Sequence, residues 1–427
     1  MSTESMSGVT KSNVIILGGG AAGMMAALFS AREGAETLLL EKNEKLGKKV
    51  YITGKGRCNL TNTAELEDFF AQVPRNPRFL QSSMHAFAWR DTVALVESLG
   101  TKTKVERGGR VFPVSDKASD VTAALQRGLR SAGAGIALNT EIVRIEKTEE
   151  GFLLQARDGR TFMCRALVIA TGGVSYPQTG STGDGYRFAQ AFGHSVIAPR
   201  GSLVGLEMAE KWPQLLMGLS LKNVRLTAKA GKKVLYNELG EMLFTHFGIS
   251  GPLVIEVSSH LPEDLAGIEL FLNLKPALSE AQLDARLVRE FEATPKKELS
   301  NVLVNLLPSR MAPVFCSLCG LARELPAGQV TKVQRRALVE HFLHLPLPVT
   351  GTRPVEEAIV TRGGVNVREI MPGSMMSRLC PGLFLCGEVL DVDAHTGGFN
   401  LQIAWSTGRM AGLEAAKYAC KEEGYGD

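Results

Sequence analysis

The sequence lacks the features that mark membrane-spanning, secreted or polyanion-binding proteins. Its 48 basic and 44 acidic residues leave a formal net charge of +4, which is too small over 427 residues to require a nucleic acid or a membrane surface as partner. Residues 1–13 are polar and do not contain the apolar core of a secretory signal. We therefore expect a cytoplasmic protein that binds a small molecule, no nucleic acid and no membrane, with its oligomeric state left open.

Cysteine and histidine are also sparse. The seven cysteines are an odd number scattered over a long chain, which argues against a disulfide framework and favours a reducing compartment. Cys316 and Cys319 have metal-site spacing, but no second pair matches them, and His341 and His344 meet the same objection. We therefore expect no bound metal.

The chain has ample length and apolar material instead. With 427 residues, of which 44% are hydrophobic, we expect two or three domains. Residues 14–31 carry no charge and are long enough to resemble a membrane span, but four glycines interrupt them. A strand, a tight turn and a helix explain this segment better.

The amino-terminal segment has the pattern of a dinucleotide-binding unit. A short apolar strand at Val14–Leu17 is followed at once by Gly18-x-Gly20-x-x-Gly23 and by a helix predicted over Ala21–Arg32. Gly18 permits the sharp turn, Gly20 removes a side chain where a pyrophosphate approaches the backbone, and Gly23 lets helix and strand pack closely. The first N–H groups of the helix then face the phosphates.

The residues after the predicted helix complete the pattern of a nucleotide-binding unit. Gly34 ends the helix, Thr37–Leu40 is predicted as a second strand, and Glu41 follows that strand. Glu41 lies close to the spacing of about 20 residues expected for the acid that binds ribose hydroxyls. The alternative role for Glu41 is that of a solvated glutamate at a strand end.

A basic, glycine-containing segment follows Glu41. Its cations are Lys42, Lys45, Lys48, Lys49, Lys55 and Arg57. Such a run is typical of a solvated loop, but this one begins where the ribose end of the nucleotide is expected, so some cations are expected to face phosphate or a reduced cofactor. Gly54–Asn59 adds turn-forming residues, which indicates backbone close to a ligand, with an ordinary exposed loop as the alternative.

Two further glycine clusters follow in the middle of the chain. The apolar run Ala166–Ala170 suits a central strand and ends in Thr171–Gly173, which leaves room above the sheet edge where ligands of open α/β sheets bind. Gly180–Gly185 is either another ligand loop or a helix cap with Asp184 near the helix start.

The segment from about Ser195 to Leu345 has a different character. It contains no second strand–glycine motif–helix unit, so any NAD(P)H has to dock without a Rossmann unit of its own. Its periodicity predicts strands and then helices, that is, a β-rich insert carrying a helical sub-insert. Ser250 and Pro252 predict a helix start, and His246 beside Phe247 is interpreted as structural.

The carboxyl-terminal segment returns to the same pattern. The apolar strand Leu383–Cys386 ends in Gly387 and Glu388, and Thr396–Asn400 precedes a helix predicted over Leu401–Lys417. The acid can bind ribityl hydroxyls, and the positive end of the helix dipole would stabilise negative charge at the flavin N1/C2 carbonyl. The alternative is a terminal unit that merely completes the sheet.

These segments together resemble the bacterial BaiN-like, or aminoacetone-oxidase-like, NAD(P)/FAD-dependent oxidoreductases. The resemblance spans nearly the whole chain. It rests on GGGAAG and on residues 54–62, 109–113, 170–173, 243–251, 363–365, 387–392 and 397–402. It implies an α/β fold in which a Rossmann-like FAD-binding domain is split by a β-barrel-like insert and a helical sub-domain.

The patterns and the resemblance together predict domains and site residues. The expected domains are 1–194 and 357–427 for FAD binding, 195–276 and 345–356 for the β-rich insert, and 277–344 for the helical sub-domain. The predicted cofactor-binding residues are Gly18, Gly20, Ala22, Gly23, Glu41, Lys42, Lys49, Gly56, Arg57, Cys58, Asn59, Val143, Ala170, Thr171, Gly172, Gly387, Glu388, Gly398, Asn400 and Leu401. Arg57, Cys58 and His395 are catalytic candidates by expected proximity to the flavin, although each has a plausible structural role.

Three functions are compatible with these patterns. The first is a reductase in which NAD(P)H reduces FAD, and flavin N5 passes hydride to an unsaturated or carbonyl-conjugated small molecule. The second is an amine oxidase that is reoxidised by oxygen. The third is a flavin-binding module or a nucleic-acid-modifying protein, which the modest net charge disfavours. A disulfide reductase is disfavoured because Cys58 has no partner cysteine nearby in sequence.

Overall fold

The computed structural model describes residues 8–262 and 264–421, which form two compact units. The first unit contains the described residues up to Ser202 and from Pro354 onward, and the second contains Leu203–Arg353. The chain therefore enters the second unit from the first and returns to the first for its carboxyl-terminal part.

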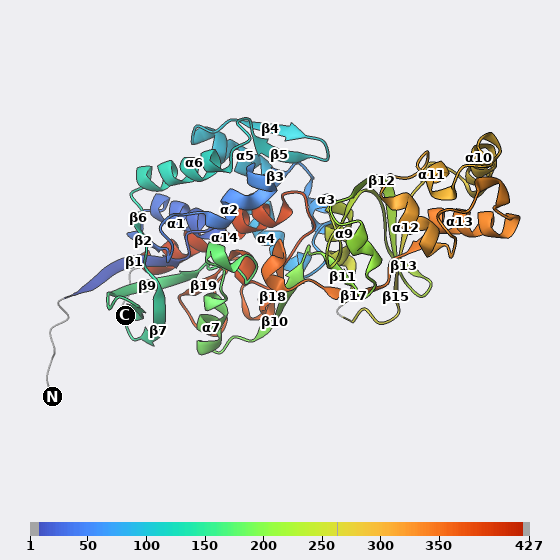
Figure 1. Cartoon of the computed structure of the whole chain (residues 1–427). Coiled ribbons are helices and arrows are strands. Elements are labelled where there is room, and N and C mark those ends of the chain that lie inside the picture. The colour runs from blue at the N-terminus through green and yellow to red at the C-terminus, as the bar shows by residue number, and fades with distance from the viewer. Residues whose placement is uncertain (1–7, 263, 422–427) are drawn as a thin grey trace. The chain divides into compact units, whose positions relative to one another are not determined.

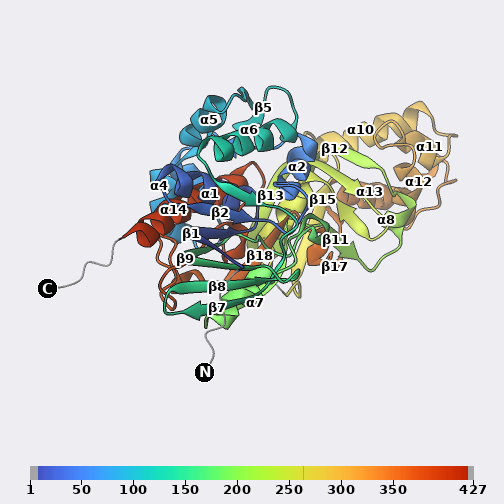
Figure 2. The same cartoon turned by 90° about the vertical axis from the view of Figure 1, so that its left-hand side faces the viewer.

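The first unit is built on a seven-stranded sheet. Its strands are β1 (Val9–Leu17), β2 (Thr37–Leu40), β6 (Gly135–Ala137), β7 (Ile142–Thr148), β8 (Gly151–Ala156), β9 (Thr161–Ile169) and β19 (Leu383–Leu385). The order is β6–β2–β1–β9–β8–β7, and β19 also pairs with β9. Figure 2 shows β2, β1, β9, β8 and β7 of this sheet. The strands β6, β2, β1, β9 and β19 are parallel, whereas β8 and β7 are antiparallel. Because parallel strands share one carboxyl edge, the three predicted glycine-bearing strand ends at β1, β9 and β19 lie on the same edge.

The helices of the first unit connect and cover these strands. They are α1 (Ala21–Arg32), α2 (Lys48–Ile52), α3 (Leu66–Ala71), α4 (Gln81–Ala86), α5 (Trp89–Ser98), α6 (Ala118–Ser131), α7 (Asp184–Ala191) and α14 (Phe399–Cys420). The carboxyl-terminal helix α14 lies beside the amino-terminal helix α1 (Figure 1). A Cβ atom on Gly408 would lie 2.3 Å from the carbonyl oxygen of Ala22, and one on Gly412 would lie 2.2 Å from that of Ala26. Glycine at these positions therefore lets the two helix backbones touch.

Two small sheets complete the first unit. Their strands are β3 (Thr61–Asn62), β4 (Thr103–Glu106) and β5 (Arg110–Pro113) in one, and β10 (Val196–Ser202) and β18 (Val360–Val365) in the other. The expected insert began at residue 195, but β10 pairs antiparallel with β18, which follows the insert. The structural boundary therefore falls at Ser202 and Pro354, and β10 belongs to the first unit.

The second unit contains a seven-stranded antiparallel sheet. Its strands are β11 (Leu206–Met208), β12 (Ser220–Ala230), β13 (Lys233–Phe244), β14 (Gly248–Ser250), β15 (Ile268–Asn273), β16 (Leu345–Pro346) and β17 (Val349–Thr352). The order is β16–β15–β12–β13–β14–β11–β17. Strands from both ends of the insert thus share one sheet, which is why the insert forms a unit with its own hydrophobic core.

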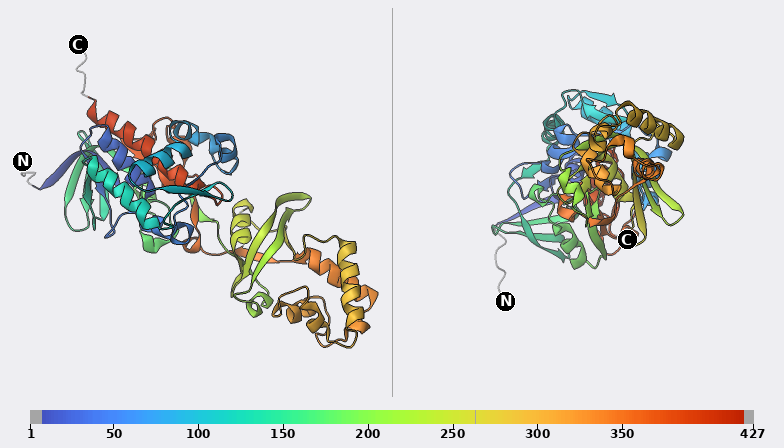
Figure 3. Two further views of the ribbon diagram at one scale, coloured as in Figure 1. Left: turned by 90° about the horizontal axis from the view of Figure 1, so that it is seen from above. Right: turned by 45° about the vertical axis from the view of Figure 1, so that its right-hand side comes forward.

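Helices accompany this second sheet. They are α8 (Trp212–Leu215), α9 (Pro252–His260), α10 (Glu280–Ala293), α11 (Leu299–Leu303), α12 (Met311–Leu318) and α13 (Lys332–His344). Figure 3 shows α10 to α13 gathered at one end of the unit. Ser279 and Thr331 cap α10 and α13 by accepting a hydrogen bond from the backbone N–H three residues later. Among the described residues, no helix has the length and apolarity needed to cross a membrane.

Candidate active site

The glycine motif joins β1 to α1 at the carboxyl edge of the first unit's sheet. Gly18 has a φ of 99°, and a Cβ there would lie 2.6 Å from the carbonyl oxygen of Ala170. A Cβ on Gly23 would lie 1.7 Å from the carbonyl oxygen of Gly18, whereas a Cβ on Gly20 would meet nothing within 4 Å. Gly18 and Gly23 are therefore required by the fold, and Gly20 keeps open space beside the start of α1.

Glu41 is held in place by the motif itself. The carboxylate is almost fully buried, and its Oε2 accepts a hydrogen bond of 2.7 Å from the backbone N–H of Gly19. Its Oε1 accepts hydrogen bonds from the backbone and the side chain of Asn43, at 2.8 and 2.6 Å. Three donors thus fix the orientation of an acceptor at the end of β2, as a ribose-binding acid requires.

Two of the predicted cofactor-binding lysines form ion pairs across this edge. Lys49 Nζ lies 2.7 Å from Glu388 Oε2, and both side chains are about one-fifth exposed. Lys42 Nζ lies 2.6 Å from Asp184 Oδ2 and donates to Thr182. These pairs connect the basic segment after β2 to the carboxyl-terminal return and to the third glycine-rich loop.

The predicted strand ends after β9 and β19 also meet α1 and α7. A Cβ on Gly387 would lie 2.6 Å from Ala22 Cβ, and one on Gly185 would lie 2.1 Å from Thr171 Oγ1. Among the described residues, the buried Thr171 Oγ1 has no hydrogen-bond partner. Glu388 accepts hydrogen bonds from the backbone N–H of Thr361 and from Ser175 Oγ, in addition to Lys49.

The loop before α14 is closed by Asn400. Its Oδ1 accepts from the backbone N–H of Ala394, and its Nδ2 donates to the carbonyl oxygens of Ala394 and His395. Gly398 has a φ of 103° and precedes the first helical residue, without a side-chain cap on the helix. Because the N-cap residue is a glycine, no N-cap side chain accepts from the first N–H groups of α14. These N–H groups form the positive end of the helix dipole.

Arg57 is held in place by residues of β4, β5 and the segment after β5. Its guanidinium donates to Asp116 and Glu106 and lies over the ring of Phe112, 4.1 Å from the ring centroid. The hydrogen bonds that Arg57 donates to Glu106 and Asp116 raise its pKa further above the usual value. The guanidinium therefore stays charged and cannot donate a proton near neutral pH.

Cys58, the next residue, lies in a different environment from that of Arg57. Its side chain is fully buried at a backbone φ of 61°, and burial raises the pKa of its thiol to about 12. Only the thiolate of cysteine is a strong nucleophile. These features favour a structural role for Cys58 over the predicted catalytic one.

Thiol labelling tests this interpretation. In the native protein at about pH 8, Cys58 is expected to react with iodoacetamide about a thousandfold more slowly than an ordinary thiol, because its pKa lies about three units higher. The exposed Cys420 serves as the internal control. Mass spectrometry before and after unfolding measures both rates, and rapid native labelling of Cys58 would contradict the assignment.

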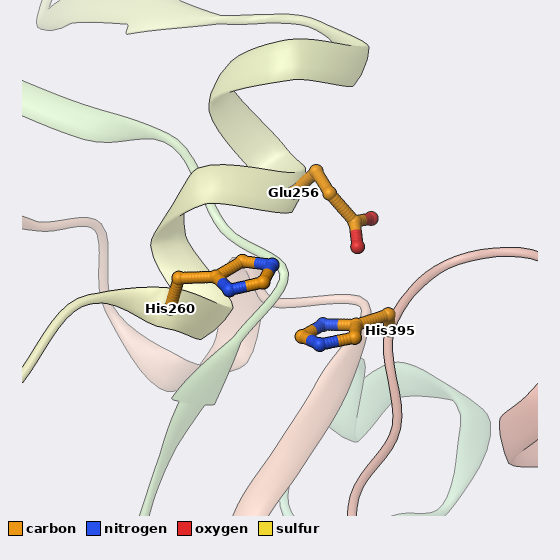
Figure 4. A group of neighbouring side chains, drawn as sticks. All are labelled: Glu256, His260 and His395. Atoms are coloured by element: carbon orange, nitrogen blue, oxygen red, sulfur yellow. The ribbon is translucent and has the colours of Figure 1, made fainter. Parts of the chain in front are cut away.

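His395, the third catalytic candidate, lies on the loop before α14. Its ring is buried, and burial lowers the pKa of the imidazole, so the ring is neutral at neutral pH. Its backbone N–H donates to the carbonyl oxygen of Gln72. Figure 4 draws His395, and it also draws Glu256 and His260, which lie one helical turn apart on α9 of the second unit.

The remaining predicted residues are spread more widely. Val143 lies on β7, and its carbonyl oxygen accepts from Arg187. Gly56 is exposed with a φ of 85°, and Leu401 is half-buried in the first turn of α14. Sequence reasoning did not single out Thr361 or Ser175, which hold Glu388, because nothing in their local sequence marks a contact with a residue so distant in the chain.

These residues fit an FAD molecule laid along the carboxyl edge. The open space at Gly20, the fixed acceptor of Glu41 and the start of α14 would hold the pyrophosphate, the ribose and the flavin ring respectively. Two buried atoms along this edge, Thr171 Oγ1 and Asn59 Oδ1, have no partner within residues 8–262 and 264–421. Such orphaned polar atoms indicate a missing partner.

Comparison with known proteins confirms the resemblance inferred from the motifs. Residues 12–414 match the family model described as the HI0933-like protein Rossmann domain. The chain is 32% identical over 407 residues to a 3-dehydro-bile acid delta(4,6)-reductase of Clostridium scindens, covering 94% of this chain and 98% of the relative. It is also 32% identical over 412 residues to a ribosomal RNA dihydrouridine synthase of Haemophilus influenzae, covering 94% and 98%.

Solved structures agree on the fold. The FrdA chain of Escherichia coli quinol fumarate reductase aligns with a TM-score of 0.51 at 16% identity, covering 98% of this chain and 72% of that one. An Sdh1 complex of Mycobacterium smegmatis aligns with a TM-score of 0.50 at 18% identity, covering 96% and 69%. The family match, the two near-full-length relatives and the glycine-lined edge lead to one conclusion: the chain belongs to the HI0933-like Rossmann-domain family and is an FAD-dependent oxidoreductase.

Proposed function

We propose that this chain uses NAD(P)H to reduce a carbon–carbon double bond conjugated to a carbonyl group. The observation that carries this proposal is the near-full-length similarity to two enzymes whose names share one reactive group. A 3-dehydro-bile acid with delta(4,6) double bonds is a conjugated ketone, and the double bond lost when uridine becomes dihydrouridine is conjugated to a ring carbonyl. Bound FAD would supply the hydride through N5.

In this proposal, the chain's own residues bind the cofactor and stabilise the negative charge that develops during the reduction. The first turn of α14 has no side-chain cap from its N-cap residue, and its N–H groups and positive dipole end would stabilise negative charge that develops beside it. Asn400 holds the preceding loop in position through both of its side-chain atoms. Lys49 and Glu388 form a partly buried ion pair, and the acceptor oxygens of Glu388 would bind hydroxyl groups of the cofactor.

The reduction also needs a proton at the carbon next to the carbonyl. Arg57 and Cys58 hold their protons at neutral pH because the pKa of each is raised. His395 is neutral because burial lowers its pKa. None of these three side chains is therefore proposed as the proton donor.

Anaerobic spectroscopy tests the proposal. The FAD-loaded protein is mixed with NADH or NADPH while the flavin absorbance is followed, and a conjugated enone or a uridine-containing RNA is then added. Rapid bleaching followed by recovery of the absorbance under anaerobic conditions supports the reductase. Bleaching by amines alone, with recovery only in oxygen, would instead establish an amine oxidase, and no bleaching by any donor would leave a flavin-binding module.

A further inference from the structure

Asp393, on the loop before α14, has a buried carboxyl group with few partners. The residue is only 1% exposed. Its Oδ2 accepts a hydrogen bond of 2.8 Å from the hydroxyl group of Ser202, at the end of β10. Its Oδ1 is also buried, and within residues 8–262 and 264–421 no donor forms a hydrogen bond with it. Because a buried carboxylate is costly unless it is paired and hydrogen-bonded, the charge on Asp393 is poorly compensated.

Three charged side chains face this carboxyl group from the elements around it. Arg75, in the segment after α3, has its Nε 3.9 Å from Asp393 Oδ1, and Arg362 on β18 adds a second positive charge. Asp391, on the same loop, adds a negative charge. Burial raises the pKa of Asp393, and the opposing effects of Ser202 and the two arginines are smaller. The neutral form is therefore more accessible to Asp393 than to an exposed aspartate.

Asp393 is connected directly to the start of α14. The next residue, Ala394, donates its backbone N–H to Asn400 Oδ1 at 2.9 Å, and its carbonyl oxygen accepts from Asn400 Nδ2 at 2.6 Å. Asn400 lies in the first turn of α14, beside which the flavin ring is expected. Since Asp393 and Ala394 are both buried, a charge on the flavin would act on Asp393 through protein and not through water.

Hydrogen bonds on both sides of Asp393 hold its loop in place. The backbone N–H of His395 donates to the carbonyl oxygen of Gln72 at 2.9 Å, and Asn76 Nδ2 donates to that of Asp391 at 2.7 Å. These contacts fix the backbone two residues before and two residues after Asp393. The loop therefore has little freedom to carry the carboxyl group into water, and a change in nearby charge is answered by binding or releasing a proton.

We propose that Asp393 takes up a proton from solvent when the bound FAD is reduced. A hydride donor supplies two electrons and the hydrogen at flavin N5, and the proton on Asp393 offsets the negative charge that this adds. A new negative charge favours the neutral form of a nearby carboxyl group. Arg75 is one-third exposed, so solvent lies one side chain away from Asp393. The inference depends on FAD at this edge of the sheet and not on the substrate that the flavin reduces.

Proton uptake during reduction tests the proposal. The FAD-loaded protein is reduced anaerobically with dithionite in weak buffer at about pH 6–9, while an indicator dye reports protons and the flavin absorbance reports reduction. Within this range the parent protein is expected to take up as much as about one proton per FAD more than Asp393→Asn, which cannot ionise. Asp158→Asn, at an exposed turn of the same unit, is the control and is expected to match the parent. Identical uptake by the parent and Asp393→Asn at every pH overturns the proposal.

Infrared difference spectroscopy identifies the group that is protonated. Reduced-minus-oxidised spectra of the parent and of Asp158→Asn are expected to contain the C=O stretching band of a newly protonated carboxyl group, which Asp393→Asn lacks. Loss of this band in Asp391→Asn and its retention in Asp393→Asn would show that the assignment is wrong.

Ser202→Ala keeps the acid and provides a test that does not depend on Asp393→Asn binding FAD. The substitution removes the one hydrogen bond to the ionised carboxyl group, so the pH range of the extra uptake is expected to move upward. An unchanged range in Ser202→Ala overturns the proposal. Because dithionite replaces NAD(P)H in these measurements, a failure of enone reduction would contradict the proposed function and leave this inference standing.

Discussion

Gly20→Ala is expected to leave the apoprotein folded and to weaken FAD binding by about a hundredfold or more, equivalent to about 3 kcal/mol. Gly20 has φ −76° and ψ −167°, which alanine adopts without strain, and a Cβ there meets no protein atom within 4 Å. The new methyl group would occupy the space through which a pyrophosphate reaches the first N–H groups of α1. Thermal unfolding of the apoprotein and fluorescence titration with FAD measure the two effects separately.

Gly373→Ala is the matched control for this experiment. A Cβ on Gly373 also meets nothing within 4 Å, and its φ lies outside the left-handed region. Both its stability and its FAD affinity are expected to equal those of the parent protein. Normal FAD binding by Gly20→Ala would mean that the dinucleotide does not cross the glycine motif, and the placement of the cofactor would be wrong.

Gly412→Ala is expected to destabilise the first unit by about 2 kcal/mol, although alanine is the better helix former by about 1 kcal/mol. The added Cβ would lie 2.2 Å from the carbonyl oxygen of Ala26, which is a backbone atom and cannot rotate away. Helices α1 and α14 would have to separate. The measurement is the midpoint of thermal unfolding, with FAD retention as the second readout, because α1 and α14 both begin at the predicted cofactor edge.

Two controls isolate the backbone contact. Lys417→Ala, at an exposed position of the same helix, is expected to change stability by less than about 1 kcal/mol. Ala26→Gly added to Gly412→Ala is expected to give no recovery, because the contact involves the carbonyl oxygen of residue 26 and not its side chain. Recovery in the double variant would show that side-chain crowding causes the loss.

The local patterns of the first nucleotide-binding unit were sufficient to predict its elements. The helix over Ala21–Arg32 and the strand over Thr37–Leu40 occur with the predicted bounds. Strand, turn and helix are encoded here by adjacent residues, so periodicity and glycine placement determine them without long-range information. The helix start at Pro252 was predicted for the same reason.

Elements that depend on distant partners were harder to predict. The strand predicted at Ala166–Ala170 is part of a longer one, because β9 runs continuously from Thr161 to Ile169 and pairs with β1 along its length. Strands β3, β4 and β5 have two to four residues each and leave no clear period. The pairing of β10 with β18 joins residues on either side of the insert, which no local window contains.

The candidate site also contains both residues that the local sequence predicts and residues that it does not. The glycines and Glu41 follow from a motif whose members lie close together in the sequence. The partners of Glu388 could not be predicted, because Lys49 is 339 positions away and Thr361 has no distinctive surroundings. The burial of Cys58 was also inaccessible, since a glycine-rich basic loop indicates exposure and only the packed structure shows the side chain facing the core.

The pairing of β19 with the end of β9 has a consequence for biosynthesis. Leu167–Ile169 pair with β1 on one side and obtain their other partner only from Leu383–Leu385. At about 5–20 residues per second, the ribosome needs roughly 10–40 s to synthesise the intervening chain. During that interval, the strand edge of β9 has no hydrogen-bonding partner at Leu167–Ile169, and the face of α1 that packs against α14 is uncovered. Chaperone binding is therefore expected to fall, and FAD binding to begin, when α14 emerges from the ribosome.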